Sequence, residues 1–272
     1  MLREITLGQY YPADSVLHRL DPRVKLMGTF IFIICTFLYN DVMTLTLLTI
    51  ALPVLIIISK VPFGYMVRGL RSVIFLMLFT AILNIFLSSG EVIFKFYFLT
   101  ITKEGIVTAA KMVIRLSYLV IGSSLMTLTT TPTALTDGLD KALHPLTRIK
   151  VPVHEIAMMM SIALRFIPIL VEETDKIMKA QAARGASFGE GRLVDRVKAY
   201  VPVMVPLFVS AFRRAGDLAM AMEARCYRGG DGRTKLKPLI YQSRDAAGYV
   251  IIFVYFIVFL IVKIFFPVAF AV

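Results

Sequence analysis

The sequence predicts an all-α protein: a polytopic helical membrane protein with about five transmembrane helices and long cytosolic or interfacial helices. Of its 272 residues, 58% are apolar and 18% are charged, against roughly 45–50% and 25% in soluble domains. The mean hydropathy is +0.77. Lys and Arg number 30 against 18 Asp and Glu. Such a basic excess can indicate nucleic-acid binding, but in so apolar a chain it indicates a cytosolic membrane face.

Five apolar runs are long enough, or nearly so, to cross a bilayer, which takes about 20 residues per helix. They are Val24–Tyr39, Met43–Ser59, Ser72–Leu87, Ile106–Thr130 and Ala246–Pro267. We therefore expect a membrane domain of four spans at 1–131, a charged helical region at 132–245 and a last span at 246–272.

The distribution of Lys and Arg predicts the orientation. The segment before the first span, the loop after the second and the 132–244 region are basic, the last with 18 basic against 11 acidic residues. A cytoplasmic N-terminus places all three on one side of the membrane. Five crossings then leave the C-terminus outside.

The charged region contains two long helical patterns. The first runs from Val151 to about Arg184, and we expect Pro168 to kink it. The second runs from about Leu193 to Arg225, with apolar residues at steps of three and four. A shorter helix should begin at Pro132, after Thr131, and stop before Pro145.

The two long helices are predicted to end alike. The first closes with Ala183-Arg184-Gly185 and the second with Ala224-Arg225-Cys226. Arg near a helix C-terminus favours the helix dipole, and a following Gly caps the helix, so a purely structural role is one interpretation. The other is that each Arg enters a groove on a partner and pairs with a carboxylate.

In this order, the motifs resemble those of the transmembrane (T) component of energy-coupling factor transporters. The resemblance covers nearly the whole chain. It rests on Tyr10–Leu26, on Leu164–Glu173 with Ala183–Gly185, and on Arg214-Ala215 with Ala219–Gly229 and Gly232–Thr234. Cys226 stands where the family motif commonly has Gly, and we expect a tolerated substitution there.

The resemblance implies an L-shaped protein of a prokaryotic plasma membrane, with long coupling helices that cross in an X. It assigns docking to two ATP-binding cassette ATPase subunits to Ala183, Arg184, Gly185, Ala224, Arg225 and Cys226. It also implies a substrate-binding membrane S component, one or several in exchange, for vitamins or other micronutrients. Because large exposed apolar surfaces mark interaction sites, we expect the S component on the long helices, with contacts at Met158, Met159, Ala211, Ala215, Ala219 and Met222.

The sequence contains no motif for ATP binding, metal binding or catalysis. It contains no G-x-x-x-x-G-K-[ST] loop, so we expect no ATP binding by this chain. Its three histidines have no ligand-spaced partners, and no catalytic triad is apparent, so a non-catalytic subunit without cofactor or metal is expected. The alternative is a self-sufficient secondary transporter or channel, with Ile156–Val171 and Ala199–Val209 as re-entrant or spanning segments.

Overall fold

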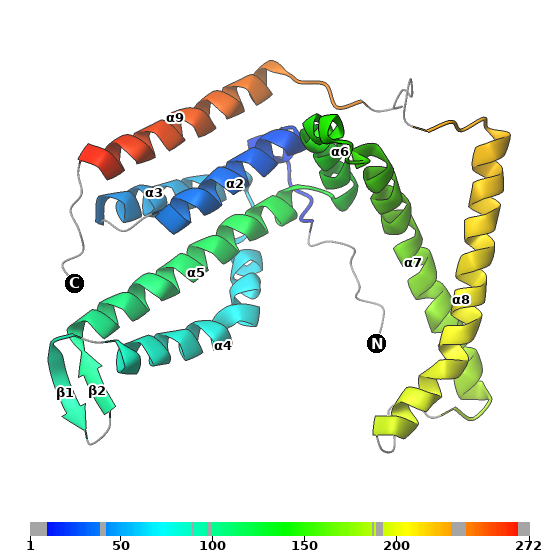
Figure 1. Ribbon diagram of the computed structural model, residues 1–272, viewed down its shortest axis with the longest axis horizontal. Helices are drawn as coiled ribbons and strands as arrows, with labels where there is room; N and C mark the ends of the chain where they lie inside the picture. Colours follow the sequence, from blue (N-terminus) through cyan, green and yellow to red (C-terminus); the bar gives the residue numbers. More distant parts are fainter. Residues whose placement is uncertain are drawn as a thin grey trace. The chain divides into compact units, whose positions relative to one another are not determined.

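The computed structural model describes residues 10–38, 42–88, 90–96, 99–186, 188, 193–229 and 238–265. These residues form helices and one two-stranded hairpin (Figure 1). They divide into two compact units, one within Gly8–Gly138 and Leu239–Val272 and the other within Leu139–Pro238. The prediction of an all-α polytopic membrane protein is confirmed.

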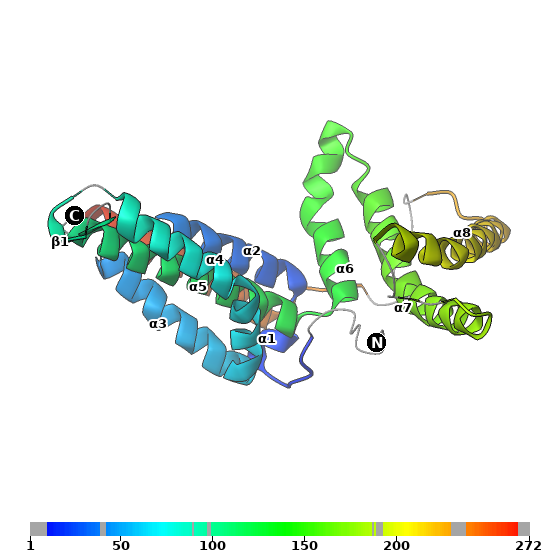
Figure 2. The same ribbon diagram turned by 90° about the horizontal axis from the view of Figure 1, so that it is seen from below.

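The first unit is a bundle of apolar helices. Its elements are α1 (Val16–Arg19), α2 (Pro22–Leu38), α3 (Val42–Ser59), α4 (Phe63–Leu87), β1 (Val92–Phe96), β2 (Leu99–Thr102), α5 (Lys103–Thr129) and α9 (Ser243–Phe265). Helix α5 is central: α4 packs along it, and α2 and α3 also contact it (Figure 2). Helix α9 packs on α2 and α3. The core includes Phe32, Cys35, Leu48, Met66 and Phe259, all nearly inaccessible.

Four helices in the described part of the chain are long and apolar enough to cross a membrane: α4, α5, α7 (Val153–Ala183) and α9. The predicted spans correspond to α2, α3, α4, α5 and α9, of which α2 and the apolar part of α3 are short. Helix α7 is among the four because it is long and its first half is almost wholly apolar. The predicted span ends at Tyr39 and Pro267 lie outside the described residues.

A short β-hairpin lies between α4 and α5, where sequence analysis identified no strand. Strands β1 and β2 are antiparallel, with Val92 opposite Thr102 and Phe96 opposite Leu99. Two strands of five and four residues are too short to give a periodic signal beside two long apolar runs.

The second unit holds most of the charged region. Helix α6 (Pro132–Leu143) begins in the first unit and leads through a 3-10 turn, η1 (His144–Ile149), into α7, and α8 (Leu193–Ala224) follows. As predicted, α6 starts after Thr131, whose hydroxyl accepts a hydrogen bond from the N–H of Ala134, and α7 continues through Pro168. The glycines at 189 and 191, which separate the two long helical patterns in the sequence, lie outside the described residues.

The N-terminal segment and the start of α2 are tied to the end of α5 by hydrogen bonds to its carbonyl groups. The N–H of Tyr11 donates to the carbonyl oxygen of Leu128 at 2.9 Å, and Lys25 Nζ donates to the carbonyl oxygen of Thr129 at 2.8 Å. His18 Nε2 lies 3.0 Å from the carbonyl oxygen of Tyr11. In this structure, much of the Tyr10–Leu26 motif therefore serves to anchor the segment on the bundle.

Candidate functional site

Helices α7 and α8 form an antiparallel pair with side-chain contacts along its length. Tyr227, just after α8, donates its hydroxyl to the sulfur of Met158 near the start of α7. Glu173 meets Arg214 further along, and Gln181 near the end of α7 meets Pro202 near the start of α8. The C-terminal end of each helix thus lies beside the N-terminal part of the other.

Glu173 is the polar centre of this pair. Its carboxylate accepts from the guanidinium of Arg214 at 2.9 Å and from the hydroxyl of Ser210. The carboxylate and guanidinium are both partly shielded from solvent, and charge-assisted bonds of this kind have stricter geometry than apolar contacts. The two signature segments around Glu173 and Arg214 are therefore brought together at one crossing.

Gln181 satisfies a carbonyl group that a proline leaves unpaired within α8. Pro206 has no N–H, so the carbonyl oxygen of Pro202, four residues earlier, lacks its helical donor. The side-chain amide of Gln181 donates to that oxygen at 3.3 Å. The prolines of α8 thus create an attachment point for α7.

Helix α7 ends in a Schellman motif. The N–H of Gly185 donates to the carbonyl of Ala182, and the N–H of Ala186 donates to the carbonyl of Gln181, both at 3.0 Å. Gly185 has φ +90°, a left-handed conformation that glycine adopts without steric cost. Arg184 is the last residue before this reversal.

Helix α8 ends in the same motif. The N–H of Cys226 donates to the carbonyl of Glu223 at 2.8 Å, and that of Tyr227 to the carbonyl of Met222 at 3.0 Å. Cys226 occupies the position of Gly185 with φ +55°, inside the narrower left-handed region open to residues with a side chain. The two predicted motifs are therefore equivalent in backbone structure, with Arg184 and Arg225 at the same position.

Both arginines are exposed, as are the residues on either side of them. Within the described ranges, neither guanidinium has a hydrogen bond or an ion pair. Since α7 and α8 are antiparallel, the two arginines lie at opposite ends of the pair. A helix of 32 residues is about 48 Å long, so a single small groove cannot bind both.

The six residues predicted to contact an S component fall on different faces. Ala215 and Ala219 of α8 are exposed, as is Met159 of α7. The other three, Met158, Ala211 and Met222, are half-buried, and Met158 contacts Tyr227. Ala211 and Met222 lie at the edge of the α8 face that packs on α7, whose centre is marked by the buried Val203.

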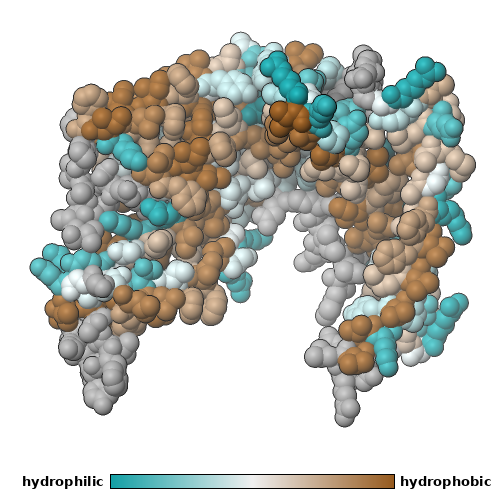
Figure 3. All heavy atoms as spheres, in the orientation of Figure 1, coloured by the Kyte–Doolittle hydropathy of each residue, from teal (hydrophilic) through white to brown (hydrophobic). Residues whose placement is uncertain are grey.

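An apolar row on the other side of α8, called here the α8 stripe, is exposed. Its residues recur at steps of four and three, which keeps them on one helix face: Val201, Val205, Phe208, Phe212, Ala215 and Ala219. Phe212 is 74% exposed. In Figure 3, apolar surface runs along the part of the molecule formed by α7 and α8, with hydrophilic residues along one edge. Sequence analysis missed Phe212, although its spacing from Phe208 and Ala215 would have identified it.

Comparison with known proteins agrees with this architecture. The cobalt transport protein family (CbiQ) matches residues 13–236. The chain is 51% identical over 260 residues to the energy-coupling factor transporter transmembrane protein EcfT of Ruminiclostridium cellulolyticum, covering 95% of this chain and 97% of that protein. Identity to the proteins of the same name is 53% over 247 residues in Clostridium kluyveri (90% of this chain, 92% of that protein) and 48% over 248 residues in Bacillus subtilis (91% and 94%).

The fold and the α7–α8 pair define a helical membrane subunit of a transporter. The chain belongs to the cobalt transport protein family, as a transmembrane component of the energy-coupling factor type.

Proposed function

We propose that this chain couples two ATPase subunits to a substrate-binding S component for the uptake of vitamins or other micronutrients. The observation that supports this most directly is the equivalence of the two helix ends. Arg184 and Arg225 occupy the same position in two Schellman motifs, exposed and without partners in the described structure. Two equal attachment points at opposite ends of a helix pair suit two separate ATPase subunits.

The chemistry of docking follows from the guanidinium group. It presents planar, paired donors that match a carboxylate in two hydrogen bonds. Each helix end is fixed by its cap, so the arginine backbone needs no ordering on binding. Movement of the ATPase subunits would then be transmitted to α7 and α8 as to a rigid pair joined at Glu173, Ser210 and Arg214.

The S component would pack on the α8 stripe. An exposed apolar row of this length indicates an interaction site, and the small residues Ala215 and Ala219 allow close approach of another helix. This assignment keeps Ala215 and Ala219 as contacts, and Met159, which is exposed on α7 outside the stripe, remains a separate proposed contact. It gives Ala211, Met158 and Met222 a supporting place at the α7–α8 interface.

The proposed orientation has the N-terminus and the α7–α8 helix ends in the cytoplasm of a prokaryotic cell, where the ATPases are. The excess of Lys and Arg in the connecting segments supports it. The chain itself would be non-catalytic, because ATP chemistry requires a phosphate-binding loop that its sequence lacks.

Replacement of both arginines tests the docking proposal. Arg184→Glu with Arg225→Glu should release the ATPase subunits during gentle purification and abolish uptake in membrane vesicles, with normal amounts of chain in the membrane. Arg213→Glu is the matched control, because Arg213 is exposed on α8 away from both helix ends. A doubly reversed chain that keeps its ATPases and its uptake would contradict the proposal.

A second experiment tests the α8 stripe. Ala215→Leu with Ala219→Leu should reduce the amount of S component that co-purifies while the ATPases remain bound. Arg213→Leu serves as control, since Arg213 is exposed on α8 and is not part of the stripe. Equal retention of the S component in both variants would exclude this face.

The length and apolarity of α7 also allow it to span the membrane, as a secondary transporter or channel would require. The location of its C-terminal end distinguishes the two arrangements. A cysteine introduced at Ala186, with Cys226 replaced by Ser, should react with an impermeant thiol reagent only from the cytoplasmic side. Reaction only from outside would favour the transporter or channel.

A further inference from the structure

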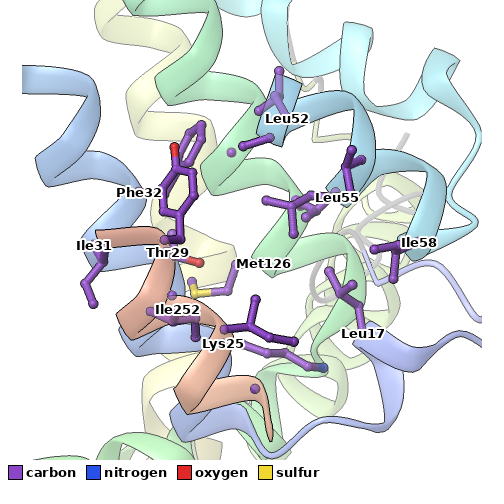
Figure 4. Close-up of a pocket in the computed structure, with 18 of the residues that line it drawn as sticks. Leu17, Lys25, Thr29, Ile31, Phe32, Leu52, Leu55, Ile58, Met126 and Ile252 are labelled. Carbon is purple, nitrogen blue, oxygen red and sulfur yellow. The ribbon is translucent and has the colours of Figure 1, made fainter. Parts of the chain in front are cut away.

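A large apolar cavity, open on one side, lies within the first unit and is lined by residues of α1, α2, α3, α5 and α9. Its volume is about 540 Å³, inside the range of roughly 300–1,000 Å³ found for ligand pockets. Figure 4 shows Ile31, Phe32 and Ile252 on one side and Leu52, Leu55 and Ile58 on the other. The lining is almost entirely hydrocarbon.

The cavity has an exposed rim formed by α3 and α9. Ile50, Val54 and Ile58 recur every four residues on α3 and line the cavity, as does Ile251 of α9. Ile50 is 63% exposed and Ile251 is 68% exposed. Because these are apolar helices of a membrane protein, the rim meets the hydrocarbon chains of the bilayer and not water.

Two sets of contacts hold the helices around the cavity in their positions. On one side, α2 and α9 are already in van der Waals contact: a Cβ at Gly248 would lie 2.9 Å from Val24 Cγ1, and one at Gly28 would lie 3.0 Å from Ile252 Cδ1. On the other side, the hydroxyls of Thr49 in α3 and Tyr118 in α5 are 2.6 Å apart. Inward collapse would disrupt these contacts, and a hydrocarbon occupant would supply the dispersion contacts that the open lining lacks.

Water is a poor occupant. The polar side chains in the lining are Lys25, Thr29, Thr129 and Tyr255. Lys25 Nζ already donates to the carbonyl oxygens of Thr129 and His18 and to the hydroxyl of Thr130, and the Thr129 hydroxyl donates to the carbonyl of Leu125. A buried water needs about two to four polar partners, and two hydroxyls cannot supply a cavity of this size.

The charged residues near the cavity indicate which kind of lipid head group would bind there. Lys25 is the one cationic residue among the lining residues, and no carboxylate is among them. Figure 4 shows Lys25 along one edge of the cavity. Lys60, two residues beyond Ile58, is exposed and has no ion pair within the described residues.

The Lys25 ammonium already makes three hydrogen bonds within the protein, so it acts on a ligand through its charge alone. The nearby carboxylates of Asp14 and Asp21 are paired with Arg19 and Arg23. The two lysines therefore leave a positive charge that favours an anionic group at this end of the cavity.

We propose that the cavity binds one acyl chain of an anionic membrane phospholipid, with the phosphate group near Lys25 and Lys60. The chain fills the space that the fixed walls leave open and restores the dispersion contacts of its lining. The site is separate from the helix ends and the α8 stripe assigned to docking.

Tryptophan fluorescence can test this, because the sequence contains no Trp. Met126 lines the cavity, so Met126→Trp in the full-length chain places one reporter there. Phe253→Trp is the control, since Phe253 is exposed on α9 and is not among the lining residues. Both variants are reconstituted in phosphatidylcholine vesicles with one tenth of the lipid replaced by phosphatidylglycerol or phosphatidylcholine brominated in the acyl chains.

The cavity reporter should be quenched more by brominated phosphatidylglycerol than by brominated phosphatidylcholine, by about fivefold in apparent affinity. The control reporter should respond equally to both lipids. In the Met126→Trp chain, Lys60→Gln should reduce the preference, and Lys25→Met with Lys60→Gln should abolish it. Lys103→Gln should leave it unchanged.

Three results would overturn the proposal. Quenching of the cavity reporter by aqueous acrylamide but not by brominated lipid would show a water-filled space. Equal quenching by the two lipids would remove the anionic head group from the site. Displacement of brominated phosphatidylglycerol by oleate at equal bulk concentration would assign the cavity to free fatty acid.

Discussion

The Asp245 carboxylate accepts a hydrogen bond from the backbone N–H of Asp21 at 2.8 Å, although the two residues are 224 positions apart. Its other oxygen accepts from the N–H of Gln242 at 2.8 Å, which caps the start of α9 as in a capping box. Asp21 in turn accepts from the N–H of Arg23 at the start of α2. One buried carboxylate thus joins the N-terminal ends of the two helices, where the helix dipoles favour negative charge.

Removal of this carboxylate should loosen the attachment of α9. Asp245 is 2% exposed, so Asp245→Ala leaves two backbone N–H groups unpaired at a cost of about 2–4 kcal/mol. Asp245→Asn, which keeps one acceptor oxygen, should cost less. Thermal unfolding of the purified chain in detergent measures both, with the exposed Asp217→Ala as control. A midpoint for Asp245→Ala equal to that of the control would show that Asp245 does not contribute to stability.

This contact shows what sequence periodicity can and cannot predict. The bounds of α7 and α8 follow from apolar spacing and from Pro and Gly, which act locally. The Asp21–Asp245 contact has no local signal, because Asp245 is indistinguishable from an ordinary first-turn acid at the start of α9. Periodicity also cannot say which of two apolar faces packs internally. Ala211 was therefore grouped with Ala215, although the first faces the α7 contact and the second the exposed stripe.

Acidification should weaken the anchored N-terminal segment. Burial lowers the pKa of His18 below its ordinary value, and the neighbouring Lys25 adds to this, while the Tyr11 carbonyl and Asp14 oppose it. The unfolded state therefore takes up a proton before the folded state as the pH falls through about 6.5. Stability at this site is present above that pH and declines below it.

The experiment compares unfolding midpoints between pH 7.5 and 5.5 for the native chain and for His18→Asn, which cannot titrate there. On acidification, the unfolding midpoint of the native chain should fall further than that of His18→Asn. Asp21 does not interfere in this window. Although burial alone would raise its pKa, the Arg23 side chain and backbone N–H hold it below the ordinary value, so its contribution is lost only at lower pH. Parallel pH profiles for the two chains would exclude a role of His18.

The Glu173–Arg214 contact should be worth more than an ordinary surface pair. One oxygen of the Glu173 carboxylate accepts from Arg214 and the other from Ser210, and the pair is partly shielded from solvent. A double-mutant cycle with Glu173→Gln and Arg214→Gln should therefore give a coupling of about 1 kcal/mol. Asp175 and the exposed Lys179, four residues apart on α7, lie 3.7 Å from each other and should give about 0.3 kcal/mol. Hydrogen exchange of the backbone amides in α7 and α8 measures the loss of stability at these two helices. Equal coupling in the two pairs would show that Glu173 does not hold the helices together.

The two helix caps should respond differently to the same side chain. Gly185→Ala puts a Cβ at φ +90°, whereas Cys226 already tolerates its own at φ +55°. Gly185→Ala should therefore cost about 1 kcal/mol at the end of α7, and Cys226→Ala should be nearly neutral. Cys226→Gly should also be nearly neutral, because relief of the backbone is offset by the greater freedom of the unfolded chain. Hydrogen exchange of the backbone amides at positions 185 and 226 measures each effect. A larger increase in exchange rate for Cys226→Ala than for Gly185→Ala would contradict the difference in backbone strain.

Docking through two arginines predicts a non-additive loss of ATPase binding. Each desolvated arginine–carboxylate pair is worth about 2–5 kcal/mol on truncation, whereas a helix-dipole effect alone is worth about 0.3–1 kcal/mol. The two sites are far apart on one rigid pair, so the bound end holds the other near its groove at high effective concentration. Arg184→Ala or Arg225→Ala should therefore leave a weakened complex, and the double change should dissociate it. Titration of the ATPases onto the immobilised full-length chain measures the three affinities. A double variant that binds as well as the native chain would leave both arginines with only the structural role of ending their helices.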